Sequence, residues 1–433
     1  MSRRFFLLFS ILMMISSVAH SQNFNPAESS PSQVSRAGAP SESLPNQGDS
    51  IISKISFTGL KRTRESFMQD SFKSYIGMPY NSKTRNNLES DLQAMNLFSS
   101  IEFSPSFIEV DSVELNVIVK EKITFIPLPF AMYSSSSGFM LGGFVMDMNA
   151  GGQKDNFVTG LIWSPDNTML LGLYSHAPKI GTPGFSVFAS TGKRDSYIKN
   201  SDGDEILKIE NFHASLGASL LLKLNRYNNL DLGLTYNGFF PYDTDIHPDA
   251  YRRNKFGLNS GWKISDQNWN GVFLSETSFG LGGRINIDTN AHLSEALSAS
   301  IKLQQPIFPK LRLNILSGAA IVFNGLITDY LQKGSGAVTI LHDNFSTPKI
   351  AGASSGLEFA LFQHEKIGTI SIYGNYEFVF AQEFDDSLLF CQGLNVGSKV
   401  YFSGLAFPAI SMGLAYNATK NKYYFSGSFG VSF

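Results

Sequence analysis

From about residue 123 onward, the chain consists of segments in which apolar and polar side chains alternate. Between residues 229 and 240, leucine or tyrosine occupies every even position from 230 to 236, and polar residues or glycine lie between them. Related alternation occurs in the segments 311–323 and 368–380. A period of two predicts β-strands with one apolar face. These segments are longer than the roughly five or six residues usual in soluble proteins and approach the ~9–11 that a tilted strand needs to cross a bilayer.

Sixteen such segments, separated by turn residues, are predicted in this region. They begin near Phe125, Phe139, Gln153, Asn167, Gly184, Lys208, Asn229, Lys255, Gly271, Leu293, Leu311, Gly356, Gly368, Leu388, Phe407 and Lys422. An even number of antiparallel strands returns the chain to the side at which it entered, as in closed bacterial barrels. We therefore expect an all-β transmembrane barrel of 16 antiparallel strands over residues 123–433.

The lengths of the predicted connections support this interpretation. Three long polar connections follow the fifth, seventh and eleventh strands, at residues 192–207, 241–254 and 325–352. Connections after even-numbered strands, such as 176–183 and 307–310, are shorter. Membrane barrels have long outer loops and short periplasmic turns. The pattern therefore predicts that the chain enters the barrel from the periplasm.

The first 21 residues have the order of a secretory signal peptide. Arg3 and Arg4 precede an apolar stretch, and small residues follow at Ala19 and Ser21. Residues 22–49 are rich in Ser, Pro, Ala and Gly and have little to bury, so we expect a flexible linker. No later segment has the ~18 consecutive apolar residues of a membrane-spanning helix. The chain is predicted to be exported without a helical anchor.

Residues 50–122 show a different succession of patterns. Alternation at 51–57 predicts a strand, helical periodicity predicts two helices, and alternation returns in two further strands. Thr63 is expected to cap the first helix, and Asn81 or Ser82 the second. The second helix would bury the face that carries Leu88, Leu92 and Met95. The order β-α-α-β-β predicts a small α+β domain with its own core.

The motifs of this domain resemble those of POTRA (polypeptide-transport-associated) domains. The family pattern contains a G-x-x-R/K-T turn, a second helix that leads to a phenylalanine, and a closing strand that ends V-x-E-K. It is matched by Gly59, Lys61, Thr63, Leu92, Phe98, Val119, Glu121 and Lys122. The resemblance implies a periplasmic domain that binds extended chains or partner proteins by adding a strand to an exposed sheet edge.

The last predicted strand places aromatic residues on one face. Tyr423, Phe425, Phe429 and Phe433 alternate with residues that are mostly small and polar. We expect a lipid-facing strand with its aromatic side chains outward and small polar groups inward. The terminal Phe433 resembles the C-terminal signal by which outer-membrane barrels are recognised for assembly.

One POTRA-like domain followed by a sixteen-stranded barrel resembles the BamA/TamA superfamily, also called surface-antigen barrels. A D-x-N-x-x-G turn near the second barrel strand is matched by Asp147, Asn149 and Gly152. A glycine-rich stretch that opens the twelfth strand is matched by Gly352, Gly356, Glu358 and Phe359.

This resemblance implies a weakly paired seam between the first and last barrel strands, where a client strand adds to the open edge. The first strand carries Phe125, Pro127 and Pro129, and the last carries the four aromatic residues named above. The prolines remove ladder donors from the first strand. A bulge at the barrel rim is the alternative explanation for them.

The predicted sixth outer loop, residues 325–352, departs from the family pattern. Family members carry an Arg-Gly-Phe/Tyr tip there, which folds into the lumen and docks on the barrel wall, whereas this loop contains no arginine. Lys333 or Lys349 would replace it only as a point charge, without a planar fork. The departure, together with the single POTRA-like domain, favours a dedicated paralogue over a general assembly factor.

Composition restricts the classes of function. Lys+Arg 34 against Asp+Glu 36 leaves no excess of positive charge, so no nucleic-acid partner is expected. Charged residues make up 16%, below the ~25% usual for soluble domains. Cys391 is the single cysteine, which excludes an internal disulfide. We predict no cofactor or metal, because the acidic segment 201–205 lacks the full ligand spacing of a calcium loop.

The expected function is the assembly, insertion or translocation of proteins at the outer membrane. The predicted partners are the lipid bilayer, unfolded outer-membrane or exported client proteins, and periplasmic chaperones or lipoproteins. No enzymatic activity is expected. The alternatives are a dedicated exporter, a passive pore or a surface antigen. A barrel-embedded hydrolase is less favoured, because the scattered histidines form no nucleophile motif.

Overall fold

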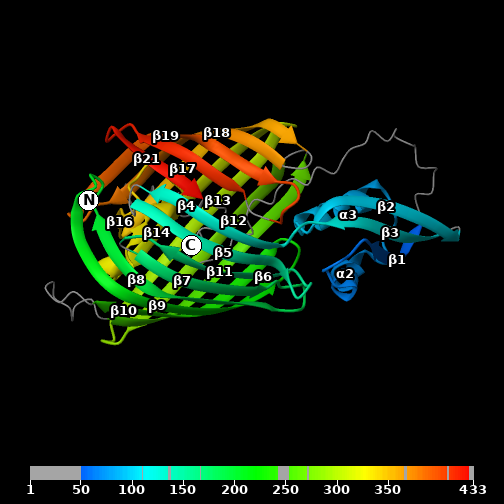
Figure 1. Cartoon of the computed structure of the whole chain (residues 1–433), viewed down its shortest axis with the longest axis horizontal. Coiled ribbons are helices and arrows are strands. Elements are labelled where there is room, and N and C mark those ends of the chain that lie inside the picture. The colour runs from blue at the N-terminus through cyan, green and yellow to red at the C-terminus, as the bar shows by residue number, and fades with distance from the viewer. Residues whose placement is uncertain are drawn as a thin grey trace, which may run out of the picture.

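The computed structural model describes residues 50–428 apart from 110, 135–137, 166, 242–252, 271–272, 365–367 and 407–408. The predicted signal peptide and linker, together with Phe429 and Phe433, lie outside the described residues. The described chain forms a small α+β domain and, end to end with it, a large sheet that curls into a barrel (Figure 1). None of the described helices is both long and apolar enough to cross a bilayer.

The small domain is a three-stranded sheet with two helices. Its elements are β1 (Ile51–Thr58), α2 (Glu65–Phe72), the 3-10 helix η1 (Lys73–Tyr75), α3 (Ser82–Ala94), β2 (Phe98–Glu109) and β3 (Ser112–Glu121). β3 lies in the centre, parallel to β1 and antiparallel to β2. Alternate residues of β3 (Val113, Leu115 and Val117) are completely buried, in one core with residues of both helices. The predicted order of strands and helices is confirmed.

The two predicted helix caps differ in outcome. Asn81 caps α3, and its side-chain oxygen accepts a hydrogen bond of 2.9 Å from the Thr84 backbone N–H. The prediction for Thr63 is wrong: Arg64 is the N-cap of α2, and no side chain caps that end. The Thr63 hydroxyl instead accepts a hydrogen bond from Asn149 of the barrel at 2.9 Å.

Sixteen antiparallel strands form the barrel sheet, in sequence order from one edge to the other. They are β4 (Phe125–Ser134), β5 (Gly138–Ala150), β6 (Asp155–Trp163), β7 (Asn167–His176), β8 (Gly184–Lys199), β9 (Glu205–Lys223), β10 (Asn228–Pro241), β11 (Arg253–Asn270), β12 (Phe273–Asp288), β13 (Leu293–Phe308), β14 (Leu311–Phe323), β17 (Lys349–His364), β18 (Gly368–Gln382), β19 (Leu388–Phe402), β20 (Ile410–Asn417) and β21 (Lys422–Ser428). Between β14 and β17 lie η2 (Ile327–Asp329), β15 (Leu331–Gln332), η3 (Lys333–Gly336) and β16 (Ser346–Thr347). The predicted fold class, a small α+β domain with a sixteen-stranded antiparallel barrel, is confirmed.

The twelfth barrel strand is the one whose predicted start is far from the observed one. β17 begins at Lys349, seven residues before the predicted Gly356, whereas the other fifteen strands begin within three residues of the prediction. The first part of β17 contains alanine, glycine and serine, which read as a loop in the sequence. Gly352 therefore lies inside the strand and pairs with Gly318 of β14.

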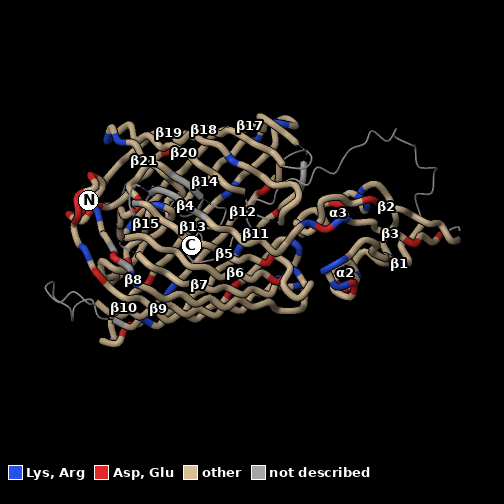
Figure 2. Tube along the Cα trace, viewed as in Figure 1, with Lys and Arg blue, Asp and Glu red and all other residues tan. Residues whose placement is uncertain are grey.

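The outer face of the barrel is apolar and the inner face is polar over much of the sheet. Leu234, Leu258 and Leu394 are more than half exposed on the outside. Inward-facing Glu276 and Glu377 are buried. Figure 2 shows long stretches of the strands without charged residues and charges gathered mainly near the two ends. An apolar outer surface of this extent fits hydrocarbon rather than water.

Candidate functional site

Arg62 joins the small domain to the first hairpin of the barrel. Its guanidinium binds the Asp147 carboxylate with both ends, Nη1 to Oδ1 at 3.3 Å and Nη2 to Oδ2 at 2.7 Å. Nη1 also donates to the Thr124 hydroxyl at 2.6 Å. A bidentate arginine–carboxylate pair fixes orientation as well as distance. Asp147 lies near the end of β5, so the contact is made at the hairpin that begins with the edge strand β4.

Thr63 and Arg64 continue this contact. Asn149 Nδ2 donates to the Thr63 hydroxyl, and the Arg64 backbone N–H donates to the Gly152 carbonyl at 2.9 Å. Gly152 has φ +73°, and a Cβ there would lie 2.3 Å from the Arg62 carbonyl oxygen. Glycine is therefore needed for this close approach. We call the set Arg62, Thr63, Asp147, Asn149 and Gly152 the clasp.

Glu121, at the end of β3, holds the turn that carries the clasp. Its carboxylate oxygens accept hydrogen bonds from the backbone N–H groups of Arg62 and Thr63, each at 2.9 Å. Burial raises the pKa of Glu121, but hydrogen bonds to its carboxylate outweigh burial and leave the pKa below its ordinary value. Gly59 begins the turn with φ +96°, and a Cβ there would lie 2.1 Å from the Val119 carbonyl oxygen.

Two other barrel turns also touch the small domain. Arg226, in the β9–β10 turn, lies 3.5 Å from the Asp91 carboxylate of α3. The Lys179 ammonium, in the β7–β8 turn, lies 4.6 Å from the centre of the Phe67 ring of α2. The domain is thus attached at separate points around one end of the barrel, which we call the domain-side end.

The first and last barrel strands lie next to each other without forming a ladder among the described residues. Cα atoms of β4 and β21 approach within 8 Å (Figure 1), yet the described part of β21 pairs only with β20, and β4 only with β5. We call this junction the seam. At its domain-side end, Ile123 pairs with the β19–β20 connection, because its N–H donates to Gly404 at 3.0 Å and its carbonyl accepts from Ala406 at 2.9 Å.

Pro127 and Pro129 explain part of the missing pairing. Both lie in β4, opposite Val145 and Gly143 of β5, in a ladder without irregularity. Proline is tolerated in a strand where its missing N–H faces away from the ladder. Residues two apart direct their N–H groups to the same edge, so the seam edge of β4 lacks two donors.

The side chains at the seam follow the predicted alternation with one exception. Phe125, Tyr423 and Phe425 point outward, with exposed fractions of 51%, 65% and 40%. The expectation of small polar groups on the inner face is wrong for Tyr424, which is buried at 7% exposure. Its ring packs edge-on against His342, with ring centres 6.1 Å apart.

The connection between β14 and β17, residues 324–348, folds into the barrel, and we call it the lumenal loop. Val338, Ile340, Leu341 and Phe345 of this loop are buried, at 3% exposure or less. Glu377 on β18 accepts hydrogen bonds from the backbone N–H groups of Thr339, at 2.6 Å, and Ile340, at 3.2 Å, and from the Thr339 hydroxyl at 3.0 Å. Hydrogen bonds to an ionised acceptor are among the stronger ones in proteins. The loop therefore docks on the wall through backbone donors rather than an arginine.

Two glycines form the seat of the lumenal loop. Gly318 of β14 and Gly352 of β17 face each other across the ladder. A Cβ at Gly318 would lie 2.5 Å from the Ser335 carbonyl oxygen, and one at Gly352 would lie 2.6 Å from the Gly336 carbonyl oxygen. The short helix η3 thus rests directly on two backbone segments, which is why small residues continue into β17.

Buried charge also anchors the loop, with the acid on the loop and the base on the wall. Lys255 of β11 and Asp329 of the loop form an ion pair of 2.6 Å, in which both side chains are nearly completely buried. Lys333 binds Asp343 within the loop itself, and Lys349 begins β17. Neither of the two predicted lysines therefore acts as a counterpart of the family arginine.

Comparisons with known proteins agree with this architecture. A family model described as POTRA, surface antigen variable number repeat, matches residues 50–122. A solved structure of BamA from Haemophilus ducreyi lacking POTRA domains 1–3 matches with a TM-score of 0.53 and 13% identity, covering 88% of this chain and 84% of that one. CdiB from Escherichia coli matches with a TM-score of 0.60 and 15% identity, covering 88% and 75%. CdiB from Acinetobacter baumannii gives 0.56 and 11%, covering 87% and 73%.

Residues 50–122 thus match the POTRA family model, and the barrel shares the fold of the BamA and CdiB structures. At these identities the solved structures establish the fold alone. A search of curated proteins finds no match.

The POTRA motif residues have two roles in the structure. Leu92, Phe98 and Val119 are buried in the core of the POTRA domain. Thr63 and Glu121 belong to the clasp and the turn behind it, and Lys61 is exposed in that turn. Two motifs that the sequence shows far apart, the POTRA turn and the D-x-N-x-x-G turn of the barrel, therefore bind each other.

Glu358, predicted as part of the strand motif, lies in a buried polar cluster in the wall. It accepts hydrogen bonds from Arg312 Nη2 at 2.7 Å, the Tyr401 hydroxyl at 2.6 Å and the Ser371 hydroxyl at 2.5 Å. Arg312 also stacks on Phe273, with 4.8 Å between its guanidinium carbon and the ring centre. The cluster joins strands β12, β14, β17, β18 and β19.

Sequence reasoning missed Arg312, Lys255 and Glu377. Each is a charged residue at an inward position of a predicted strand. A charged residue at an inward position indicates a buried polar contact, because a charge inside a barrel needs a partner. The local sequence pattern does not show which residue that partner is.

Proposed function

We propose that this protein inserts or translocates client proteins at the outer membrane, by pairing their strands with the open seam between β4 and β21. The seam is the observation that carries the proposal. An edge whose backbone groups are unpaired is a template for another strand. The likeness to BamA and CdiB barrels supports a role of this class, and the apolar outer face supports the outer membrane as its location. We propose no enzymatic step.

A second edge, in the POTRA domain, is suited to receiving the client first. In the described residues, β2 is an outer strand of the sheet, and no strand pairs with its free side. The outer side of β1 is partly covered, since Ile52 exchanges hydrogen bonds with Met78 and Gly77. Phe107 and Ile108 on β2 are 41% and 59% exposed. We propose that β2 binds an extended client segment by strand addition, with the domain facing the periplasm.

The lumenal loop favours the seam over the lumen as the client's route. Its buried residues and the Glu377 and Lys255 anchors occupy the barrel interior. A client strand at the seam needs no displacement of the loop, whereas a chain in transit through the lumen does. We therefore propose insertion as the main activity and export as the second candidate.

The test compares a deletion strain complemented with the wild-type gene or with Pro127→Val/Pro129→Val. The variant restores two N–H donors to the seam edge of β4, and so allows a β4–β21 ladder that competes with a client. We expect the outer-membrane proteome of the variant strain to lose the same proteins as the deletion strain. Leu128→Val, at the residue between the two prolines, is the control, because it adds no donor.

The pattern of loss separates the candidates. A fall in membrane-inserted barrels supports insertion, and loss of one or a few secreted proteins supports a dedicated exporter. An outer-membrane proteome and secreted fraction that are unchanged by the deletion would contradict both, and would leave a passive pore or a surface antigen.

A further inference from the structure

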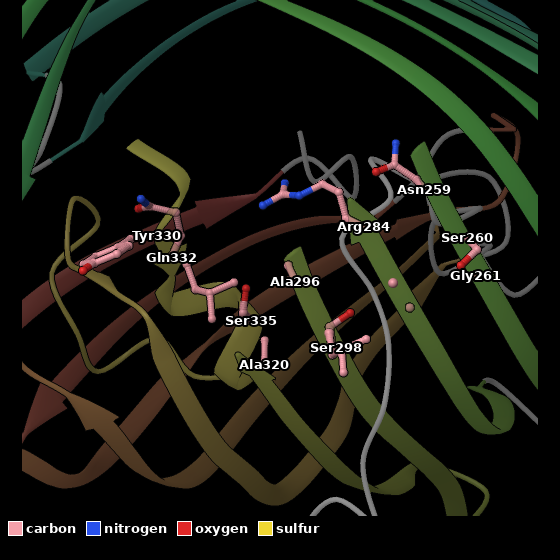
Figure 3. A pocket seen from close by; sticks show the side chains of 14 residues that line it. Asn259, Ser260, Gly261, Arg284, Ala296, Ser298, Ala320, Tyr330, Gln332 and Ser335 are labelled. Carbon is pink, nitrogen blue, oxygen red and sulfur yellow. The ribbon is translucent and has the colours of Figure 1, made fainter. Parts of the chain in front are cut away.

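A cavity of about 100 Å³ lies between the inner face of β11–β14 and the lumenal loop (Figure 3). This volume is several times the ~10–15 Å³ of open space that one water molecule needs in a cavity. The wall supplies Asn259, Arg284 and Ser298, and the loop supplies Tyr330, Gln332 and Ser335. Polar side chains from both the wall and the loop thus reach the cavity, beside apolar ones such as Leu297 and Leu331.

Arg284 is the one charged residue among those that line this cavity. Figure 3 shows it reaching from β12 toward Tyr330 and Gln332 of the loop. Its Nε atom is buried and has no hydrogen-bond partner among the described residues. No carboxylate of the described chain forms an ion pair with it. Arg284 as a whole is partly buried, and a cation that faces a cavity without an acid partner attracts an anion.

Asp329 is the acid whose charge acts on Arg284, but it is already engaged. One of its oxygens accepts from the Lys255 ammonium at 2.6 Å, and the other accepts from the Leu326 backbone N–H at 3.1 Å. Asp329 therefore neutralises Lys255 rather than Arg284. The positive charge of Arg284 remains available to a ligand.

The surroundings of Arg284 leave room for one. In the ladder, Arg284 lies opposite Asn259 on one side and Ala296 on the other. Alanine is too short to cover the guanidinium. The Asn259 Oδ1 atom is also buried without a partner among the described residues, and a half-turn of its side-chain amide presents the Nδ2 donor in its place.

We propose that this cavity binds a small oxyanion, a carboxylate or a phosphate group, on Arg284. The planar fork of a guanidinium matches two oxygens of either group. Asn259 and the hydroxyls of Ser298 and Ser335 surround the same space. The oxyanion links β12 to the lumenal loop, which is otherwise anchored by Lys255 and Glu377. This site is independent of the seam and of the proposed client pairing.

The test is binding of trifluoroacetate to the full-length protein in detergent, followed by fluorine NMR. We expect saturable binding to wild type, at least tenfold weaker binding to Arg284→Gln, and intermediate binding to Arg284→Lys, which keeps the charge but not the fork. Lys302→Gln is the matched control. Lys302 is also an inward cation, but it already pairs with Glu276 at 2.9 Å, so binding should not change.

Competition identifies the preferred source of the oxyanion. Displacement at lower concentration by inorganic phosphate indicates a phosphate group, and displacement at lower concentration by acetate indicates a carboxylate; either order supports the site. Equal binding by wild type and Arg284→Gln, or no saturable binding by wild type, would overturn the proposal. If Arg284→Gln does not fold, Arg284→Lys against Lys302→Gln gives the same comparison.

Discussion

Replacing Glu377 by glutamine tests how the lumenal loop is held. In the wild type, one carboxylate accepts from the backbone N–H groups of Thr339 and Ile340 and from the Thr339 hydroxyl. Glutamine has nearly the same shape but only one acceptor oxygen, and its NH₂ group faces donors. The amide oxygen can take the place of Oε2, which accepts from both backbone N–H groups, but these hydrogen bonds then lose the charge. The NH₂ group replaces Oε1, so the buried Asn395 amide that donated to Oε1 loses its acceptor.

The expected magnitude follows from these contacts. Hydrogen bonds to charged groups contribute about 1.5–3 kcal/mol each and neutral ones about 1 kcal/mol, and an orphaned buried donor costs about 1–3 kcal/mol. The docked state of the loop should therefore weaken by about 3 kcal/mol. Because 1.4 kcal/mol corresponds to a factor of ten, the loop should open roughly a hundredfold more often.

Hydrogen–deuterium exchange of a peptide that covers residues 337–345 measures this opening. We expect faster exchange at Thr339 and Ile340 in Glu377→Gln and unchanged exchange in the POTRA domain. Glu383→Gln is the control, since Glu383 lies in the β18–β19 turn and its Oε2 atom has no partner among the described residues. Wild-type exchange at both loop amides in Glu377→Gln would refute the view that the carboxylate holds the loop.

Three further predictions concern the clasp, the glycine seat and pH. Arg62→Ala should broaden the distance distribution between spin labels on the POTRA domain and the barrel. Adding Asp147→Asn should broaden it little more, because the two changes remove the same ion pair. Additive effects would show that the two residues act separately. Gly352→Ala should destabilise the docked loop by about 1–3 kcal/mol through overpacking, read as faster loop exchange, whereas Gly172→Ala, where a Cβ meets nothing within 4 Å, should leave it unchanged. The folded-state pKa of Glu121 is lowered, so its contribution is present above the carboxyl's ordinary pKa and is lost as pH falls through the lowered value. Hydrogen–deuterium exchange of the POTRA domain, measured as the pH is lowered, should therefore show a loss of protection in wild type that is absent in Glu121→Gln. Parallel pH profiles for the two proteins would contradict this.

The barrel strands were predictable because lipid imposes the same demand on every strand. An outward apolar residue at each second position leaves a period that local sequence displays, as in the stretch around Leu234. The start of β17 could not be predicted in this way, because contact with lipid does not determine its residues. Gly352 is selected by the loop helix that rests on it, not by lipid or by strand propensity.

The candidate sites were predictable only as far as their residues interact locally. Asn81 accepts its capping hydrogen bond from Thr84, only three residues away in the chain, and the predicted cap is confirmed. Thr63 has the right type and position for a cap, but its hydroxyl is taken by Asn149, which lies 86 residues away. A competing partner at such a distance leaves no mark on the helix sequence.

Loop docking shows a related limit. The missing arginine correctly excludes an arginine fork, and the lysines considered in its place do not fill that role. The donors that bind Glu377 are mostly backbone N–H groups, which every residue except proline carries. Such a contact has no residue signature, and only the inward glutamate on β18 was available as a signal.

The clasp also has a mechanical consequence. It fastens the POTRA domain to the hairpin that begins with β4, and Ile123 ties the start of that hairpin to the β19–β20 connection. Among the described residues, β20 is the only strand that pairs with β21, although Tyr424 of β21 packs against His342 of the lumenal loop. The two sides of the seam therefore differ in stiffness, and a pull on the POTRA domain acts as torque on β4 while β21 stays compliant. A client strand delivered by the domain would meet a β4 that is held in place and a β21 that can move. The seam should therefore open by displacement of β21.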